Sequence, residues 1–534
     1  MLRQACLARL GEGVHDVLVV GAGINGAVSA AALAGRGARV ALVDRGDFAS
    51  FTSQESSNLV WGGIKYLETY ELPLVRDLCV SRNLLMRSYP STVREIRFLA
   101  TVERGFRHHP LLLWASTWAY WLIGNGATEA PRRLGRAELE AEEPMVDTSR
   151  FGGCVEYSDA YLFDNDARFV FGFVRSAMDR GAVAVNYAES CGARLEDGVW
   201  VSEVRDLESG RTITVRSRAL INAAGAFADA HNQASGLQTA HRHVFSKGIH
   251  LIVDRITDSR RVLAFFADDG RLFFAIPMGS KTCLGTTDTR VDDPRTGVTD
   301  ADRDFVLDNV NRRLRLARPL TRADIVAERC GVRPLVVERG ASEAKDFLQL
   351  SRKHAVDVDA HRCHLTIYGG KLTDCINVGD EVCEAISGMG IALPSPRARW
   401  FGEPPPEVRE EFLAQARALD LDALTSPHAT EPLSQRFWRR YGHQAVALLD
   451  AIRADRRQAE LLIEGTEYTR CEIAHAASRE MVVRLEDFLR RRSKIALMMR
   501  RDEIRAARGL DEACRMLFGD EADARLAEYF GRND

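Results

Sequence analysis

Short apolar runs alternate with a small-residue helical pattern near the start of the chain. The run Asp16–Val20 is apolar, ends in glycine and predicts a buried parallel strand. The alanine-rich stretch after it predicts a helix that closes at 35–37, and a second apolar run, 39–43, ends at Asp44. A strand, a helix and a second strand in this order predict the first unit of a parallel α/β sheet.

The pattern changes twice further along the chain. Between about 238 and 327, the strand-like runs HLIVD, VLAFFA, RLFFAIPM and TCLGTTD alternate with polar turns and predict a mostly antiparallel substrate-binding layer. The proline-rich stretch 395–409 predicts a linker, and 410–534 shows helical periodicity alone. We therefore expect an α/β domain with an antiparallel substrate layer, followed by an all-α C-terminal domain.

One uncharged run, Leu111–Ile123, contains three tryptophans in thirteen residues. A helix that spans a membrane needs about 20 apolar residues, so this run is too short to cross one. Two interpretations remain open. The run is a buried helix or a lid over a cavity, or it is a monotopic patch that dips into the membrane interface, where tryptophan is favoured.

Composition narrows the class of protein. The chain has 534 residues, 46% of them hydrophobic and 28% charged, which is typical of a soluble globular protein. A net charge of −3 gives no reason to expect a nucleic-acid partner. The eleven cysteines form no C-x-x-C pair, which argues against a disulfide framework or a zinc site and favours a reducing compartment. The first sixteen residues lack the apolar run of a signal peptide, so we expect a cytoplasmic location or the cytoplasmic face of a membrane.

A glycine motif lies between the first predicted strand and helix. Gly21 suits the tight turn, Gly23 lets the backbone approach a pyrophosphate, and Gly26 lets the helix pack closely on the strand. The helix N-terminus then offers N–H groups to the phosphates. Asp44, at the tip of the second strand, is placed to accept the ribose hydroxyls. The motif predicts dinucleotide binding.

Two later turns favour FAD over NAD, because FAD needs contacts from distant segments. An apolar strand enters the small-residue turn 222–225, and another enters the glycine turn 369–373. Turns at the ends of strands bind ligands in open α/β sheets. We expect these turns to approach the cofactor through Ala224, Gly225, Gly369, Gly370, Leu372 and Thr373.

Ordered blocks along nearly the whole chain resemble the FAD-dependent, quinone-reducing glycerol-3-phosphate dehydrogenases. The blocks include VGAGINGA, EYSDAYLFDNDAR, KGIHLIV, LGTTDT, GVRPL and YGGKLT. The resemblance implies an FAD-binding Rossmann-like domain of the glutathione-reductase and glycine-oxidase type over 1–394. Its FAD-binding segments would be about 14–90, 150–235 and 330–392, with substrate segments at 91–149 and 236–329. It also implies further FAD contacts from Thr52, Ser53, Ser56, Ser57, Gly62 and Gly63.

The stretch SSNLVWGGIKYLE departs from the family pattern S-S-K-L-I-H-G-G-L-R-Y-L-E at positions that the resemblance places in the active site. In this chain Asn58 replaces the lysine of the pattern, Trp61 the histidine and Lys65 the arginine. Lysine keeps the charge of arginine but loses its planar fork. Tryptophan in place of histidine removes a titratable imidazole and adds a large, flat apolar ring system. Both changes leave the exact substrate open.

Other positions match the family's site residues. Arg333 and Lys371 match cations that face the substrate, His250 matches a histidine on the substrate side, and Tyr66 matches the tyrosine of R-Y-L-E. The resemblance thus implies a small anionic substrate held by an anion clamp of Lys65, Arg333 and Lys371, beside Trp61 and Tyr66. His250 is our candidate base, because an unperturbed imidazole titrates near neutrality.

The leading hypothesis is an FAD-dependent dehydrogenase of glycerol 3-phosphate or a related polyol phosphate. Hydride would pass to flavin N5, with Arg333 and Lys371 steadying the developing charge, and the electrons would go to quinone at the inner membrane. An amine or amino-acid oxidase is one alternative, and a catalytically inactive flavin-binding protein is another. A homodimer remains open.

Overall fold

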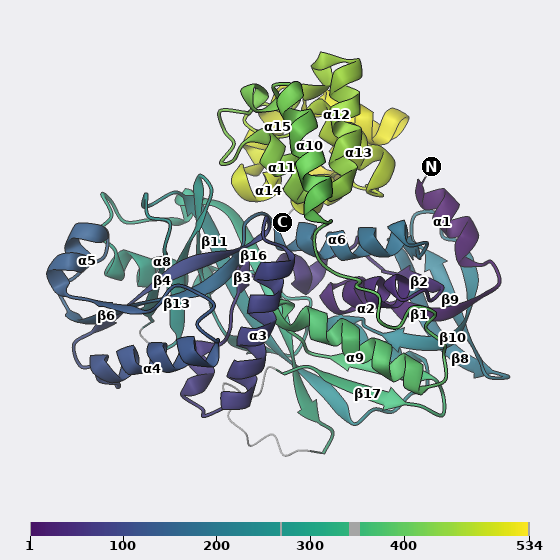
Figure 1. Ribbon diagram of the computed structural model, residues 1–534, viewed down its shortest axis with the longest axis horizontal. Coiled ribbons are helices and arrows are strands. Elements are labelled where there is room, and N and C mark those ends of the chain that lie inside the picture. Colours follow the sequence, from purple (N-terminus) through teal and green to yellow (C-terminus); the bar gives the residue numbers. More distant parts are fainter. Residues whose placement is uncertain (1, 268–269, 341–352, 532–534) are drawn as a thin grey trace.

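The computed structural model describes residues 2–267, 270–340 and 353–531. Its first layer is a sheet with the strand order β17-β18-β10-β1-β2-β7, in which β18, β10, β1, β2 and β7 run parallel (Figure 1). The strands of this sheet are β1 (Val14–Val20), β2 (Val40–Val43), β7 (Val183–Val185), β8 (Ala188–Glu196), β9 (Val199–Asp206), β10 (Thr212–Asn222), β17 (Ala355–Asp359) and β18 (His364–Tyr368).

One face of this sheet is covered by helices. The alanine-rich α2 (Ile24–Gly35) packs between α6 (Asp166–Asp179) and α9 (Cys375–Gly388) (Figure 1). Small side chains let α2 approach β1 closely, and its residues from Asn25 to Ala34 are buried. The strand, helix and second strand predicted from the sequence are confirmed.

The second layer is a mostly antiparallel sheet with the order β15-β11-β14-β13-β12-β4-β6-β3; β16 pairs with β11, and β5 with β6. Its strands are β3 (Leu59–Val60), β4 (Val93–Glu103), β5 (Arg132–Leu134), β6 (Phe151–Leu162), β11 (His241–Asp254), β12 (Val262–Phe266), β13 (Leu272–Met278), β14 (Lys281–Gly285), β15 (Thr289–Val291) and β16 (Ile325–Glu338). The four strand-like runs of 238–327 form β11 to β14. Because β6 pairs with β4, the segment predicted to bind FAD from 150 begins with a strand of this second sheet.

In the long antiparallel pair β11–β16, successive side chains point to opposite faces of the sheet, so the two faces have different surroundings. Ile249, Leu251 and Val253 point into a hydrophobic core that also contains residues of α8 (Asp300–Arg313). The alternate residues, which include Gly248 and His250, therefore face the opposite side. Gly248 and His250 thus share the face opposite to this core, while Lys247 lies on the side of α8 and pairs with Asp302.

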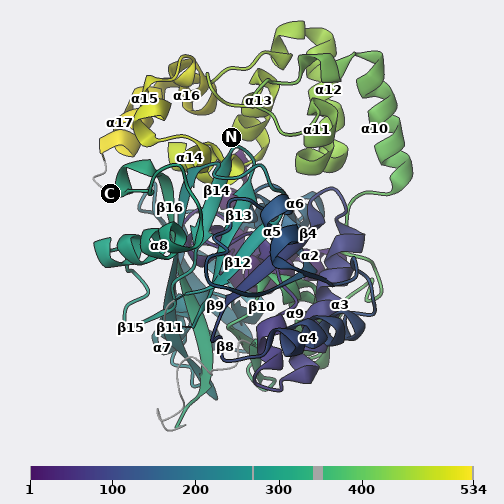
Figure 2. The ribbon, with the colours of Figure 1, turned by 90° about the vertical axis from the view of Figure 1, so that its left-hand side faces the viewer.

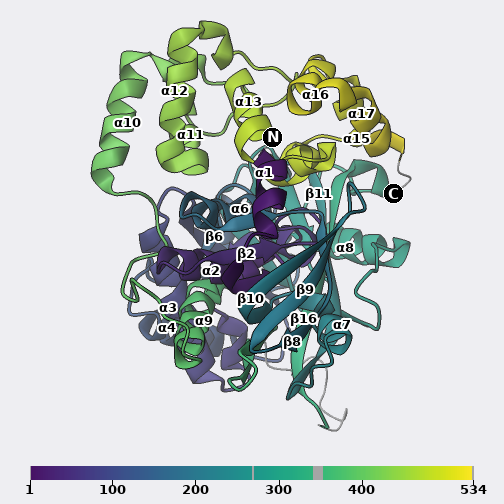
Figure 3. The same ribbon diagram turned by 90° about the vertical axis from the view of Figure 1, so that its right-hand side faces the viewer.

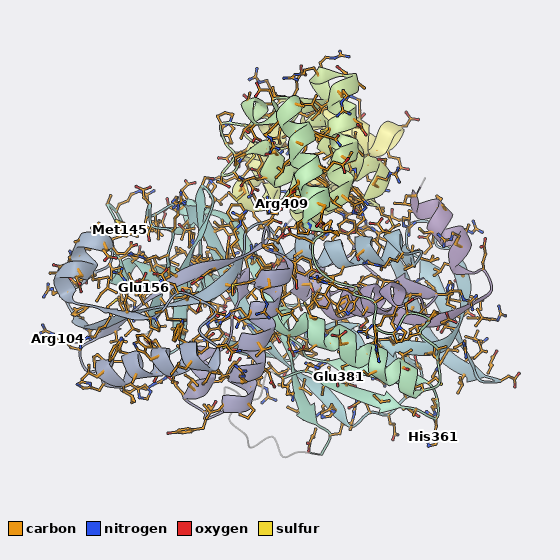
Figure 4. All side chains as sticks on the ribbon, viewed as in Figure 1. Arg104, Met145, Glu156, His361, Glu381 and Arg409 are labelled. Atoms are coloured by element: carbon orange, nitrogen blue, oxygen red, sulfur yellow. The ribbon has the colours of Figure 1, made fainter. Side chains whose placement is uncertain are left out.

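The chain ends in a helical domain that lies above both sheets (Figures 2 and 3). Its α-helices are α10 (Pro406–Ala418), α11 (Leu433–Tyr441), α12 (Ala445–Ala454), α13 (Arg470–Arg479), α14 (Ile495–Met498), α15 (Arg501–Ala506), α16 (Leu510–Phe518) and α17 (Ala522–Gly531). Glu156 of β6, Glu381 of α9 and Arg409 of α10 mark the three parts of the molecule (Figure 4). The fold class predicted from the sequence is confirmed.

The remaining α-helices lie around the sheets: α1 (Leu2–Leu10), α3 (Leu72–Ser88), α4 (Pro110–Ile123), α5 (Arg136–Glu142) and α7 (Ala228–Ala234). The uncharged run of the sequence forms α4, in which only Thr117 and Tyr120 are buried. Leu112 is 56% and Leu122 is 65% exposed, so of the interpretations left open for this run the buried helix is wrong. Over the described ranges, none of the helices has the length and apolarity needed to cross a bilayer.

Candidate active site

The glycine motif forms the turn between β1 and α2. Gly21 has a φ of +97°, and a Cβ there would lie 2.5 Å from the carbonyl oxygen of Ala223. A Cβ on Gly26 would overlap the carbonyl oxygen of Gly21. Gly23 differs, because the nearest atom to a Cβ there is Ser53 Oγ at 3.1 Å. The protein itself therefore requires Gly21 and Gly26, whereas Gly23 keeps space open in front of the helix.

Asp44 and Ser53 complete this end of the site. The Asp44 carboxylate accepts hydrogen bonds from the backbone N–H groups of Ala22 (2.6 Å) and Gly46 (2.8 Å), and burial raises its pKa to about 6. Ser53 Oγ accepts from the N–H of Ile24 at 3.0 Å, at the first turn of α2. These groups line a cavity of about 650 Å³ that also includes the turn at Ala224 and Gly225.

The last glycine turn is joined directly to the first motif. Asn25 Nδ2 donates to the carbonyl oxygen of Gly369 at 2.8 Å, and a Cβ on Gly370 would lie 2.8 Å from Asn25 Oδ1. Leu372 and Thr373 follow in the turn that leads into α9. The glycine turns at 21–26 and 369–373, more than 300 residues apart in the sequence, thus meet at the edge of the parallel sheet. A glycine cradle, a carboxylate and two further turns at this edge fit FAD.

The serine loop between these turns is tied to both sheets. Thr52 Oγ1 donates to the carbonyl oxygen of Val332 at 2.7 Å, and the N–H of Ser56 donates to Asp166 Oδ2 at 2.8 Å. Ser57 follows as a half-buried residue of the same loop. The structure thus holds the predicted serine loop between α6 and β16.

Lys371 and Tyr66 meet at the substrate end. Lys371 Nζ donates to Tyr66 Oη at 2.8 Å and lies 4.1 Å from the centroid of the Tyr66 ring. Trp61 is half-buried, and its ring centroid lies 6.2 Å from that of Tyr66 and 6.5 Å from that of Phe274. Lys65 belongs to the same turn as Tyr66 but is exposed. Trp61 therefore packs against Tyr66 inside the site, whereas the substituted Lys65 lies at the surface.

Arg333 and His250 come from the paired strands β16 and β11. Arg333 Nη2 donates to Thr286 Oγ1 at 3.1 Å, and its guanidinium lies where a Cβ on Gly248 would be. His250 is 3% exposed, and neither ring nitrogen has a hydrogen-bond partner in the described part of the chain. Burial, together with Arg329 and Arg333, lowers the pKa of His250 well below 6.5. The expectation that His250 titrates near neutrality is thus wrong; the imidazole is neutral.

Two features of the SSNLVWGG stretch have structural causes that the sequence did not reveal. Asn58 adopts a φ of +60°, which asparagine tolerates, and its Nδ2 donates to the carbonyl oxygen of Asp164 at 2.9 Å. A Cβ on Gly62 would overlap the Tyr120 hydroxyl, and a Cβ on Gly63 would lie 2.6 Å from the Tyr66 ring. The paired glycine is therefore required by packing within the protein.

A buried carboxylate beneath this loop was missed. Asp159 accepts hydrogen bonds from the N–H of Gly62 (2.9 Å), Arg82 Nη1 (2.8 Å) and Tyr120 Oη (2.8 Å). Burial raises the pKa of Asp159, while Arg82 opposes that shift. An acidic residue inside the apolar strand EYSDAYLF was the signal that could have indicated it, because buried carboxylates need charged or hydrogen-bonding partners.

Three arginines of the helical domain reach the cofactor end. Arg491 Nε and both Nη atoms of Arg492 bind the Asp47 carboxylate at 2.7 to 2.8 Å, and Arg490 Nη2 donates to the carbonyl oxygen of Gln54. All three arginines and Lys494 are buried or nearly so. The charges of this basic cluster are thus used inside the protein, between the helical domain and the loop after Asp44.

The parallel sheet with its glycine turn, its carboxylate and two later turns defines the class of FAD-binding oxidoreductases. Residues 16–367 match the family model described as FAD dependent oxidoreductase, and residues 409–520 match the C-terminal domain of alpha-glycerophosphate oxidase. The chain is 32% identical to glycerol-3-phosphate dehydrogenase 2 of Mycobacterium tuberculosis over 99% of this chain and 90% of the relative. It is 27% identical to the aerobic glycerol-3-phosphate dehydrogenase of Escherichia coli over 91% and 95%.

A solved structure has the same fold. The glycerol-3-phosphate dehydrogenase from Bacillus halodurans complexed with FAD superposes with a TM-score of 0.73 at 23% identity, over 99% of this chain and 97% of that one. The chain belongs to the family of FAD-dependent glycerol-3-phosphate dehydrogenases. Its cofactor is FAD, and it is an oxidoreductase.

Proposed function

We propose that the chain oxidises the secondary alcohol of glycerol 3-phosphate or of a related polyol phosphate. The relatives named above act on glycerol 3-phosphate by their names. The observation that carries the proposal is the pair of cations Arg333 and Lys371 near the joint of the two sheets. A Cβ on Gly369, two residues before Lys371, would lie 3.5 Å from the carbonyl oxygen of Pro334, next to Arg333.

Each residue has a role in this reaction. Arg333 and Lys371 hold the anionic group through charge-assisted hydrogen bonds and steady the developing alkoxide. His250, buried and neutral, accepts the hydroxyl proton at a ring nitrogen that has no partner in the described residues. Trp61 forms a flat apolar wall beside Tyr66. When bound, FAD supplies the hydride acceptor and passes the electron pair on, in our proposal to quinone.

An anaerobic reduction assay tests the proposal. The FAD-loaded protein is mixed with polyol phosphates, hydroxy acids and amino acids, and the absorbance of oxidised flavin is followed. Bleaching by glycerol 3-phosphate or another polyol phosphate supports the proposal. Bleaching by amino acids alone would instead identify an amino-acid oxidase, and a flavin that none of these compounds bleaches would identify an inactive binding protein.

We further propose peripheral contact with the cytoplasmic face of a membrane through α4. This helix exposes apolar side chains, namely Leu112, Trp114 and Leu122. Exposed leucine and tryptophan side chains on a helix suit insertion into a membrane interface. The protein should sediment together with vesicles of anionic phospholipid, and high salt or mild detergent should release it from them. Leu112→Glu with Leu122→Glu should abolish sedimentation, while Leu195→Glu, at a leucine 39% exposed on β8, should not. Equal sedimentation of both variants would exclude α4 as the contact.

A further inference from the structure

A phenylalanine in the wall of the FAD cavity has a backbone conformation that suits glycine. Phe51 has a φ of +65°, a left-handed conformation that is a true outlier for a bulky residue and costs free energy. The residue begins the serine loop and lines the cavity of about 650 Å³ that also contains Gly23 and Asp44. Strained residues cluster at ligand clamps and active sites, so the contacts of this ring indicate what the strain achieves.

The ring of Phe51 meets an aromatic ring from another wall of the cavity. The ring centroids of Phe51 and Phe227 lie 5.0 Å apart, with an interplanar angle of 56°. Phe227 ends the short turn after β10, and both rings are half-buried and line the cavity. Ser53, two residues after Phe51, binds the first turn of α2, where the helix offers its N–H groups to phosphates. The aromatic pair therefore joins two walls of the cavity beside the position expected for the pyrophosphate of FAD.

An arginine from the substrate layer reaches the same aromatic pair. Arg295 lies on the segment between β15 and α8 and lines the cavity, and its guanidinium carbon is 5.1 Å from the ring centroid of Phe227. The segment is anchored to β11, because Lys247 Nζ donates to the carbonyl oxygen of Gly297 at 3.3 Å. The cavity at the edge of the parallel sheet thus receives a cation from the second sheet.

The charge of Arg295 is not neutralised by an ion pair within the described ranges of the chain. Asp293 accepts a hydrogen bond at 2.8 Å from the backbone N–H of Arg295 and not from its guanidinium. Arg45 differs, because its guanidinium lies 5.4 Å from the ring centroid of Phe227 but also 3.8 Å from the Glu189 carboxylate. Of these two arginines in the cavity wall, Arg295 therefore has its charge available for an anionic ligand.

We propose that Phe51, Phe227 and Arg295 form a clasp for the adenosine diphosphate end of FAD. The two rings cover the pyrophosphate and slow its release, and Arg295 binds its negative charge. Among the described residues, the lining of the cavity includes Asp44 but not Lys371, so the clasp acts at the dinucleotide end and not at the substrate end. The inference requires FAD but no particular substrate, so it can fail while the proposed oxidation of a polyol phosphate stands.

Binding of ADP and of adenosine to the apoprotein tests the charge of the clasp, because only ADP carries a pyrophosphate. Arg295→Gln should raise the Kd of ADP about tenfold or more, the effect of losing one charge-assisted contact, and leave the Kd of adenosine unchanged in calorimetric titrations. The control is Arg290→Gln, at an exposed arginine of β15 outside the cavity, which should change neither Kd. An unchanged Kd of ADP in Arg295→Gln, an equal rise for adenosine, or an equal rise in Arg290→Gln would overturn the role of Arg295.

The rate of FAD release tests the aromatic pair. Phe51→Gly removes the ring and relieves the strain of the positive φ, so the apoprotein should keep its melting temperature to within a few degrees. FAD should nevertheless dissociate about tenfold faster, as followed by the rise of flavin fluorescence after dilution. Phe227→Ala should speed release by a similar factor, and the double variant should release FAD no faster than either single variant, because both changes open the same clasp.

Two results would overturn the aromatic part of the clasp. The first is an unchanged rate of FAD release in Phe51→Gly, or rates that multiply in the double variant. The second is a large fall in the melting temperature of the Phe51→Gly apoprotein, which would show that the ring only supports the fold. If Phe227→Ala does not fold, Phe51→Gly decides alone.

Discussion

The dinucleotide end of the site is built on one continuous segment, residues 16–57, which later turns complete, whereas the substrate end has no such segment and is assembled from four distant ones. The first end uses the Gly21 turn, Asp44 and the serine loop, which are continuous in sequence. The second end uses Trp61 and Tyr66, then His250 on β11, Arg333 on β16 and Lys371 after β18. The core of the dinucleotide end is a local motif. The substrate end exists only when both sheets have formed, because its residues come from both.

The two ends also differ in how they are held. The loop after Asp44 is fixed by Asp47, which binds Arg491 and Arg492 of the helical domain. At the substrate end, His250 keeps unpartnered nitrogens within the described chain. The cofactor end is therefore fixed by buried ion pairs with the helical domain, while Lys371 at the substrate end bonds to Tyr66, a neighbour within the site.

The largest expected effect comes from breaking the contact of the helical domain with the cofactor end. Arg492→Met leaves Asp47 buried with one arginine fewer, which should lower the free energy of unfolding by about 3–5 kcal/mol. Urea unfolding measures this change. Arg453→Met removes an exposed ion pair with Asp450 and should cost less than about 1 kcal/mol. Similar losses in both variants would show that the Asp47 cluster does not hold the domains together.

Gly23 separates cofactor binding from folding. Gly23→Val fills space that only Ser53 Oγ approaches, so the apoprotein should fold, while FAD binding should weaken about 10- to 100-fold through overpacking against the pyrophosphate. The ratio of flavin to protein absorbance and the melting temperature of the apoprotein measure the two effects. Gly26→Val, which overlaps Gly21 itself, should fail to fold. Normal FAD retention in Gly23→Val would contradict this division.

Asp44 should make FAD binding depend on pH. Burial raises its pKa to about 6, so the carboxylate, which we propose accepts the ribose hydroxyls, is ionised above pH 6 and becomes protonated below it. FAD affinity should thus be full above pH 7 and fall about tenfold by pH 5. Fluorescence titration of the apoprotein measures the Kd. Asp44→Asn should bind FAD weakly at both pH values; a wild-type affinity that rises on acidification would reverse the assigned role.

The smallest effect concerns the substituted positions of the substrate end. Trp61→His with Lys65→Arg restores the family pattern and should raise kcat/KM on glycerol 3-phosphate by up to about tenfold, if this chain prefers a substrate with an apolar part against Trp61. Lys65 is exposed, so Lys65→Arg alone should change little. High activity on glycerol 3-phosphate in the unchanged protein, lowered by the double change, would show that Trp61 and Lys65 serve the same substrate.

The sequence predicted the parts that depend on local spacing. The glycine turn, Asp44, the antiparallel layer and the helical domain follow from short-range patterns, and the family resemblance is confirmed. Burial could not be predicted from spacing. The neutral state of His250 depends on its burial and then on two arginines of another strand. The exposure of α4 and the burial of Arg490–Arg492 depend on which surfaces the domains cover. Asp159 was missed for the same reason.

The central claim is that Arg333 and Lys371 hold an anionic substrate at the substrate end of the site. Anaerobic flavin reduction by glycerol 3-phosphate and by glycerol, compared in the unchanged protein and in Lys371→Gln, tests it most directly. The unchanged protein should prefer the phosphate strongly. Lys371→Gln should weaken binding of glycerol 3-phosphate by about 10- to 100-fold, with little change for glycerol, because one charge-assisted contact is lost. An undiminished preference for the phosphate in Lys371→Gln would contradict the account.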